Sequence, residues 1–228
     1  MIKDNLAAVY ERIDAAAKES GRSKEDITLI AVTKTHPVEV INEALALGIT
    51  QIGENRPQEV RDKYPYVDKA DWHLIGQLQT NKIKYIIDKV CMIHSVDSIR
   101  LMDEINRHAE KHSLCMDILI QVNISGEETK SGITPSELSD MLTHAGELSN
   151  IRVRGLMTIA PNAEDAVVEK CFSDMHALYS ETSQKTYKNV TMDYLSMGMS
   201  GDYEKAIKHG ANMVRVGRSI FGAREYAK

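Results

Sequence analysis

Two short segments late in the chain combine apolar strand-like runs with small residues. The first is Leu195-Ser-Met-Gly-Met-Ser-Gly-Asp202, and the second is Val214-Arg-Val-Gly-Arg-Ser-Ile-Phe-Gly222. In each, an apolar run gives way to small residues and then to a helix-like stretch, so backbone N–H groups at the two turns can converge on one anion. In a (β/α)8 barrel, the loops after the seventh and eighth strands are the usual phosphate site. The two segments therefore predict a ligand that carries a phosphate group.

One lysine stands at the end of the first strand-like run, Ile27–Lys34. A lysine at the carboxyl end of a buried strand cannot easily extend to bulk water, so its amino group faces the barrel mouth. Desolvation there favours the neutral amine, which can attack a carbonyl carbon. The position alone also fits a lysine that reaches solvent or pairs with Glu54. The phosphate nest expected at the same rim favours a chemical role for Lys34.

Polar residues also follow later strand-like runs on the same rim. The second run ends in Ile52-Gly-Glu-Asn55, and the third, Trp72–Gly76, contains His73. Such residues contact a ligand or cap a helix, and Asn55 and His73 are the better ligand candidates, although His73 alone also fits a structural histidine. After the fourth run, Asp97 fits a helix N-cap.

The sequence shows no pattern typical of a metal site, a nucleophile elbow or a Walker loop. Its eight histidines lie apart, without a His-x-x-x-His pair near a carboxylate. Met157, Met197 and Met199 can pack against a flat ring, but filling the core is the usual role of methionine.

The composition fits one globular domain, residues 1–228. With 43% hydrophobic and 27% charged residues, the 228-residue chain can bury one sizeable core. Its net charge of −5 and its interleaved signs argue against a nucleic-acid-binding face. No apolar run approaches the ~20 residues of a membrane span, and the first residues lack a signal-peptide core. Three isolated cysteines fit reduced, mostly buried thiols in a cytoplasmic protein.

Strand-like and helix-like runs alternate along the chain, which is typical of βα units and a parallel sheet. An amphipathic helix, roughly Ile2–Ser20, comes first and ends at Gly21 as a C-cap glycine. Eight expected strands favour a single (β/α)8 TIM barrel with an extra N-terminal helix over a doubly wound open sheet, because no dinucleotide fingerprint follows the first strand. These strands are Ile27–Lys34, Thr50–Gly53, Trp72–Gly76, Cys91–His94, Met116–Ile124, Val153–Thr158, Met192–Ser196 and Met213–Val216.

Seven segments together form a specific combination of motifs. They are Val32-Thr-Lys34, Ile52-Gly-Glu-Asn55, Trp72-His-Leu-Ile-Gly-Gln-Leu-Gln-Thr-Asn-Lys82, His94-Ser-Val-Asp97, Leu195-Ser-Met-Gly-Met-Ser200, Val214-Arg-Val-Gly217 and Ile220-Phe-Gly222. In this combination the chain resembles the pyridoxal-phosphate homeostasis protein family, single-domain relatives of the N-terminal barrel of alanine racemase. The resemblance covers practically the whole chain.

The resemblance implies a fold-type III barrel with pyridoxal 5′-phosphate (PLP) held as an internal aldimine on Lys34. It also implies phosphate contacts from Ser200, Gly201 and Gly217, and an arginine, here Arg215, bonded to the pyridine nitrogen.

Three further residues complete the expected cofactor site. Asn55 resembles the family's polar contact beside the ring, and we count Met199 among the cofactor-binding residues. The residue after Gly217 is commonly Thr or Ser in this family but is Arg218 here. Its backbone N–H or its guanidinium could replace the hydroxyl as a phosphate contact.

Arg215 limits the chemistry that the expected cofactor can support. Arginine does not give up its proton, so it would keep the pyridine nitrogen unprotonated and the ring a weak electron sink. Transamination is then disfavoured, which leaves racemisation or simple holding of the cofactor. The racemase takes its second acid/base group, a tyrosine, from a C-terminal domain and a partner subunit. This chain ends at Lys228, and none of its nine tyrosines matches that group.

We therefore expect a monomer that buffers PLP or delivers it to PLP-dependent apo-enzymes, with no robust reaction of its own. A slow PLP-dependent racemase or lyase is the rival interpretation. A third is a class I aldolase that uses Lys34 on a phosphorylated sugar without a cofactor.

Overall fold

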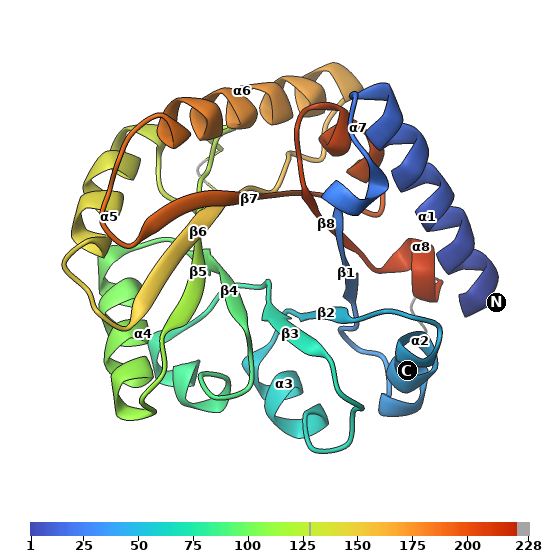
Figure 1. Cartoon of the computed structure of the whole chain (residues 1–228), viewed down its shortest axis with the longest axis horizontal. Helices are drawn as coiled ribbons and strands as arrows, with labels where there is room; N and C mark the ends of the chain where they lie inside the picture. Colours follow the sequence, from blue (N-terminus) through green and yellow to red (C-terminus); the bar gives the residue numbers. More distant parts are fainter. Residues whose placement is uncertain (128, 223–228) are drawn as a thin grey trace.

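A computed structural model of the chain describes residues 1–127 and 129–222, which form a closed barrel of parallel strands (Figure 1). Neighbouring strands pair in sequence order, and the last strand pairs with the first to close the barrel, with Thr28 opposite Met213. The predicted fold class is confirmed. The strands are β1 (Thr28–Val32), β2 (Gln51–Glu54), β3 (Asp71–Leu74), β4 (Met92–Val96), β5 (Met116–Gln121), β6 (Ile151–Met157), β7 (Val190–Met199) and β8 (Met213–Val216).

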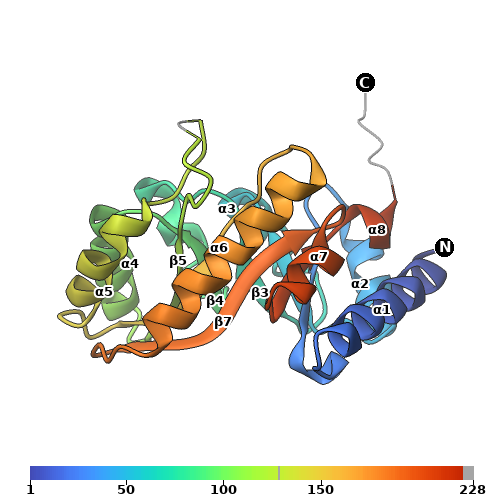
Figure 2. The same ribbon diagram turned by 90° about the horizontal axis from the view of Figure 1, so that it is seen from above.

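Helices surround the barrel and cover the outward faces of its strands (Figures 1 and 2). The connection after β3 is a 3₁₀ segment, η2 (Thr80–Tyr85), rather than an α-helix. The α-helices are α1 (Ile2–Glu19), α2 (Val38–Ala46), α3 (Pro57–Lys63), α4 (Ile99–Lys111), α5 (Leu138–Ala145), α6 (Asp165–Ser183), α7 (Tyr203–Lys208) and α8 (Arg218–Phe221). The 3₁₀ segments are η1 (Lys24–Asp26), η2 (Thr80–Tyr85) and η3 (Pro135–Glu137).

The extra N-terminal helix forms as predicted and covers α7 and α8. Leu6, Val9 and Ile13 are buried on one face, because residues three and four apart share a face of a helix. Gly21 has φ +71°, the left-handed conformation that ends a helix at low cost for glycine.

Two local expectations were wrong. Asp97 does not cap α4; the hydroxyl of Ser98, the next residue, accepts a hydrogen bond from the Leu101 N–H at 3.3 Å. Of the three cysteines, Cys91 and Cys115 are exposed and only Cys171 is buried, because the first two lie at the starts of strands rather than within them.

The core has two parts, one inside the barrel and one between the strands and the helices. Strands such as β1 and β4 are buried on both faces, which explains their continuous apolar runs. Apolar side chains in the barrel interior are Ile30, Met92, Leu119, Met157 and Met213, with Tyr194 against them.

Among the helices of residues 1–127 and 129–222, none combines the length and the apolar character that a membrane span needs.

Candidate functional site

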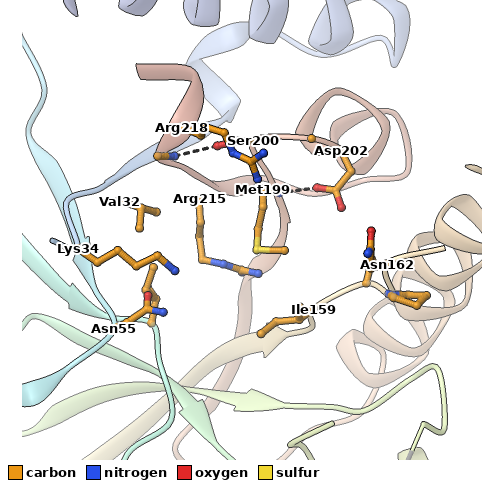
Figure 3. Close-up of a pocket in the computed structure, with 15 residues that line it drawn as sticks. Val32, Lys34, Asn55, Ile159, Asn162, Met199, Ser200, Asp202, Arg215 and Arg218 are labelled. Atoms are coloured by element: carbon orange, nitrogen blue, oxygen red, sulfur yellow. Dashed lines mark hydrogen bonds between the residues drawn. The ribbon is translucent and has the colours of Figure 1, made fainter. Parts of the chain in front are cut away.

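A cavity of about 310 Å³ opens at the carboxyl ends of the strands (Figure 3). All eight residues named from the sequence as cofactor-binding line it: Lys34, Asn55, Met199, Ser200, Gly201, Arg215, Gly217 and Arg218. Val32, Ile75, Ile159, Ala160, Pro161, Asn162 and Asp202 complete the lining. The fold therefore brings the eight residues expected from the sequence together at one cavity.

Lys34 lies two residues beyond β1, in the turn that leads to α2. The His36 N–H donates to the Thr33 carbonyl at 3.1 Å, and Thr35 has φ +67°. A positive φ is rare for threonine and must be held by its surroundings. In Figure 3 the Lys34 side chain extends into the cavity, toward Asn55 and Arg215. Its amine thus reaches the space that a ligand would occupy.

A partly buried ionic cluster beside this turn fixes its backbone. Lys63 Nζ lies 2.8 Å from both Glu54 Oε1 and Glu59 Oε2, and it donates to the Thr33 carbonyl at 3.1 Å. Glu59 Oε2 also accepts from the Thr35 N–H at 2.8 Å. Burial raises the pKa of the Glu54 carboxyl, and Lys63 opposes that rise. The cation that partners Glu54 here is Lys63, and the cluster holds the residues on both sides of Lys34.

The loops after β7 and β8 form a cradle at the opposite side of the cavity. The Gly217 N–H donates to the Ser200 hydroxyl at 3.0 Å, which ties the two loops together (Figure 3). A Cβ on Gly217 would lie 3.1 Å from the Val32 carbonyl, so glycine allows the end of β8 to approach β1 closely. Gly201 has open space around it. These loops line the cavity with small residues, which allow an anion to approach the backbone closely.

Glycine is also required just before this cradle, at Gly198. Its φ is +94°, and a Cβ there would lie 2.5 Å from Ala206 Cβ and 2.9 Å from Tyr203 Cα. Any larger residue would push β7 away from α7 and so move the cradle.

Arg215 places a buried cation at the cavity wall. The residue is 3% exposed, and its guanidinium donates to the Ser196 hydroxyl at 2.5 Å and to the Thr158 carbonyl at 2.9 Å. Burial lowers the pKa of Arg215 to about 10, against the opposing effect of Asp202, so it stays protonated at neutral pH. Within residues 1–127 and 129–222, no carboxylate lies within ion-pair distance of it. The site therefore favours a ligand with an acceptor or a negative charge.

His73 does not belong to this cavity, so of the two roles that the sequence left open for it, ligand contact and structural histidine, the structure supports the structural one. It lies within β3 rather than beyond its end, and it faces the barrel interior, where its Nδ1 lies 3.0 Å from His94 Nε2. It lines a separate cavity of about 250 Å³ at the other end of the barrel, together with Gln51, Asp71 and Cys91.

Sequence reasoning missed two polar residues of the lining, Asn162 and Asp202. Asp202 Oδ1 accepts the Met199 N–H at 2.6 Å and so shapes the β7–α7 turn (Figure 3). Burial raises the pKa of Asp202. An aspartate directly after the small residues of this loop was the signal that could have identified it.

Comparison with known proteins shows where this chain belongs. Residues 5–225 match the family described as alanine racemase, N-terminal domain. A pyridoxal phosphate homeostasis protein from Aquifex aeolicus is 45% identical over 228 residues, which cover 98% of each chain. The protein of the same name from Escherichia coli K12 is 40% identical over 233 residues, covering 100% of this chain and 98% of its own. The chain belongs to the pyridoxal phosphate homeostasis protein family.

A solved structure extends this family comparison to three dimensions. PipY of Synechococcus elongatus PCC7942, determined with PLP bound, is 31% identical, with a TM-score of 0.84. The match covers 97% of this chain and 100% of PipY. The family resemblance inferred from the sequence is therefore confirmed.

Proposed function

We propose that this protein binds PLP in the cavity at the carboxyl ends of the strands and serves to buffer or deliver it. One observation carries the proposal: Lys34, the Ser200–Gly217 cradle and the buried Arg215 all face a single cavity. These are the three partners that PLP needs, for its aldehyde, its phosphate and its ring nitrogen. The volume of about 310 Å³ suits a small cofactor. The PLP bound to a relative, PipY, supports the same assignment.

Each lining residue has a role in this proposal. The backbone around Ser200, Gly201 and Gly217 would hold the phosphate, with Arg218 supplying a further donor beside it. Asn55 and Met199 would contact the ring; the guanidinium of Arg215 would donate to its nitrogen. When bound, PLP supplies an aldehyde that condenses with amines and a ring that can accept electrons. Lys34 Nζ would form a C=N bond to that aldehyde carbon, with loss of water.

The lining favours a carrier over an enzyme. Besides Lys34, the titratable side chains among its described residues are Asp202, Arg215 and Arg218, with no histidine, tyrosine or cysteine. Racemisation removes a proton from one face of a substrate carbon and adds a proton to the other face. It therefore needs a second acid/base group within hydrogen-bond reach of that carbon. The Asp202 carboxylate has a structural role, because its Oδ1 accepts the Met199 N–H in the β7–α7 turn. An arginine beside the ring nitrogen also keeps that nitrogen unprotonated. We accordingly propose that a cytoplasmic monomer gives up its cofactor to PLP-dependent apo-enzymes.

The test combines a spectrum with mass spectrometry. With PLP added, the wild-type protein should show a band at ~420 nm that borohydride abolishes, and the reduced adduct should map to the peptide of Lys34. Lys34→Ala should lose the band but keep the barrel folded, because truncating a rim side chain leaves no core cavity. Lys84→Ala, at an exposed position in η2, is the matched control and should keep the band. An adduct on another lysine, or a band that survives in Lys34→Ala, would overturn the assignment.

A second experiment separates the carrier from the enzyme. Chiral chromatography after incubation with a panel of amino acids should detect no turnover in the ordinary range of about 1–1000 per second. Turnover in that range, abolished in Lys34→Ala, would identify a racemase or lyase instead.

A further inference from the structure

The barrel interior contains one continuous line of polar side chains among apolar ones. Arg215 donates to the Ser196 hydroxyl at 2.5 Å, and that hydroxyl lies 3.1 Å from His94 Nδ1. His94 Nε2 lies 3.0 Å from His73 Nδ1, and His73 Nε2 lies 2.6 Å from Gln51 Oε1. The line joins β8, β7, β4, β3 and β2, although its members are far apart in the sequence. It starts at the cofactor cavity and ends at the cavity on the other side of the barrel.

Both ends of this line dictate the direction of its hydrogen bonds. At one end, a guanidinium can only donate, so Ser196 accepts from Arg215. At the other end, Gln51 Nε2 lies 2.7 Å from Asp71 Oδ2, and a carboxylate can only accept. The amide oxygen of Gln51 therefore faces His73, whose Nε2 must carry the proton.

The remaining bonds follow from the fixed ends. With its proton on Nε2, a neutral His73 accepts at Nδ1, so His94 donates from its own Nε2 and accepts at Nδ1. The Ser196 hydroxyl then donates to His94. The Cys91 thiol, 3.5 Å from His73 Nε2, does not compete, because its proton points to the Trp72 carbonyl at 3.2 Å. Every bond runs the same way, from a cation to an anion.

Burial keeps both imidazoles in the neutral form that this direction needs. It lowers the pKa of His73 to about 4, against the opposing effect of Asp71. The pKa of His94 is held well below its ordinary value by burial, and further by His73 and Arg215. Bonds aligned head to tail polarise one another, so the line spreads the charge of a buried guanidinium that forms no ion pair with a carboxylate of the described residues.

We propose that Ser196, His94 and His73 form a hydrogen-bond relay of fixed direction that positions Arg215 at the cofactor cavity and links it to the opposite mouth of the barrel. Ser196 and His94 are positioning residues: they act through the guanidinium rather than on the ligand. The relay rests on the proposed function only where it concerns the bound cofactor.

The first test uses the protein without cofactor. Long-range ¹H–¹⁵N spectra of labelled protein should show His73 and His94 as neutral Nε2–H tautomers at pH 7. In Ser196→Ala, exchange of the Arg215 guanidinium protons should accelerate at least about 10-fold, because a charge-assisted hydrogen bond is lost. Gln51→Leu, at the far end, should turn His73 into a mixture of tautomers. Thr28 lines the same far cavity but lies outside the relay, so Thr28→Val should leave the tautomer of His73 unchanged.

The second test adds PLP and reads its absorption spectrum. Ser196→Ala should shift the band and weaken binding about 10-fold. Leu119→Met, a volume-conserving change in the same interior, should do neither. An Nδ1–H tautomer at either histidine, or Arg215 exchange unchanged in Ser196→Ala, would overturn the relay. Absence of PLP binding in the wild type would instead overturn the proposed function, while the spectra of the cofactor-free protein would still decide the relay.

Discussion

Acidification from pH 7.5 to pH 5.0 should destabilise the fold through His73. Its pKa is about 4 in the folded protein, against an ordinary value of 6.5 in the unfolded chain. Between these values the unfolded state binds more protons than the folded state, so the free energy of unfolding rises with pH. The stabilisation is complete above pH 6.5 and is lost as the pH falls toward 4.

The size of this effect follows from the same two pKa values. At 1.36 kcal/mol per pH unit, the full separation corresponds to about 3 kcal/mol, of which about 2 kcal/mol is lost by pH 5.0. The group is 2% exposed, so solvent screening reduces this little. His94 contributes in the same direction, because its pKa is also lowered. Glu54, whose pKa is raised by burial, contributes in the opposite direction.

A comparison of variants isolates the His73 contribution from these others. Urea unfolding at pH 7.5 and 5.0 should show wild type losing about 2 kcal/mol more than His73→Gln, which cannot titrate there. His112→Gln removes an exposed histidine at the end of α4 and should behave as the wild type. If wild type and His73→Gln lose the same free energy within about 0.5 kcal/mol, the argument that His73 is neutral and buried in the folded state is wrong.

Three further substitutions test the packing that positions the cavity, each by urea unfolding. Phe172→Ala, at a fully buried position in α6, should lower the free energy of unfolding by about 3–5 kcal/mol; a loss below about 1 kcal/mol would contradict its burial. Gly198→Ala should cost more than about 1 kcal/mol and weaken PLP binding, because the new Cβ meets Ala206; unchanged stability would refute the tight turn. Ser98→Ala should lower the free energy of unfolding by about 1 kcal/mol, because the hydrogen bond from the Leu101 N–H is lost. An unchanged free energy of unfolding would show that Ser98 does not cap α4.

The sequence was sufficient for the barrel and for eight of the residues that line the cavity at the carboxyl ends of the strands, although not for Asn162 and Asp202. Apolar runs of strand length separated by helical stretches specify parallel βα units, and parallel strands end on one rim. Lys34 and the segments around Ser200 and Gly217 each follow a strand, so their convergence in one cavity needed no knowledge of side-chain packing. The chemistry of an amine beside small, anion-binding loops then pointed to a phosphorylated carbonyl ligand.

Tertiary structure alone decided which polar side chains enter the barrel and which partners they have. His73 follows an apolar residue near the end of its strand, and the sequence does not say whether it faces the rim or the interior. The answer depends on the register with β2 and β4, which turns it toward His94. Likewise, His94 and Ser196 are 102 residues apart and meet only because the barrel closes. Local sequence locates each strand to within a few residues. Strand tilt and closure decide which side chains meet inside, since those depend on every strand at once.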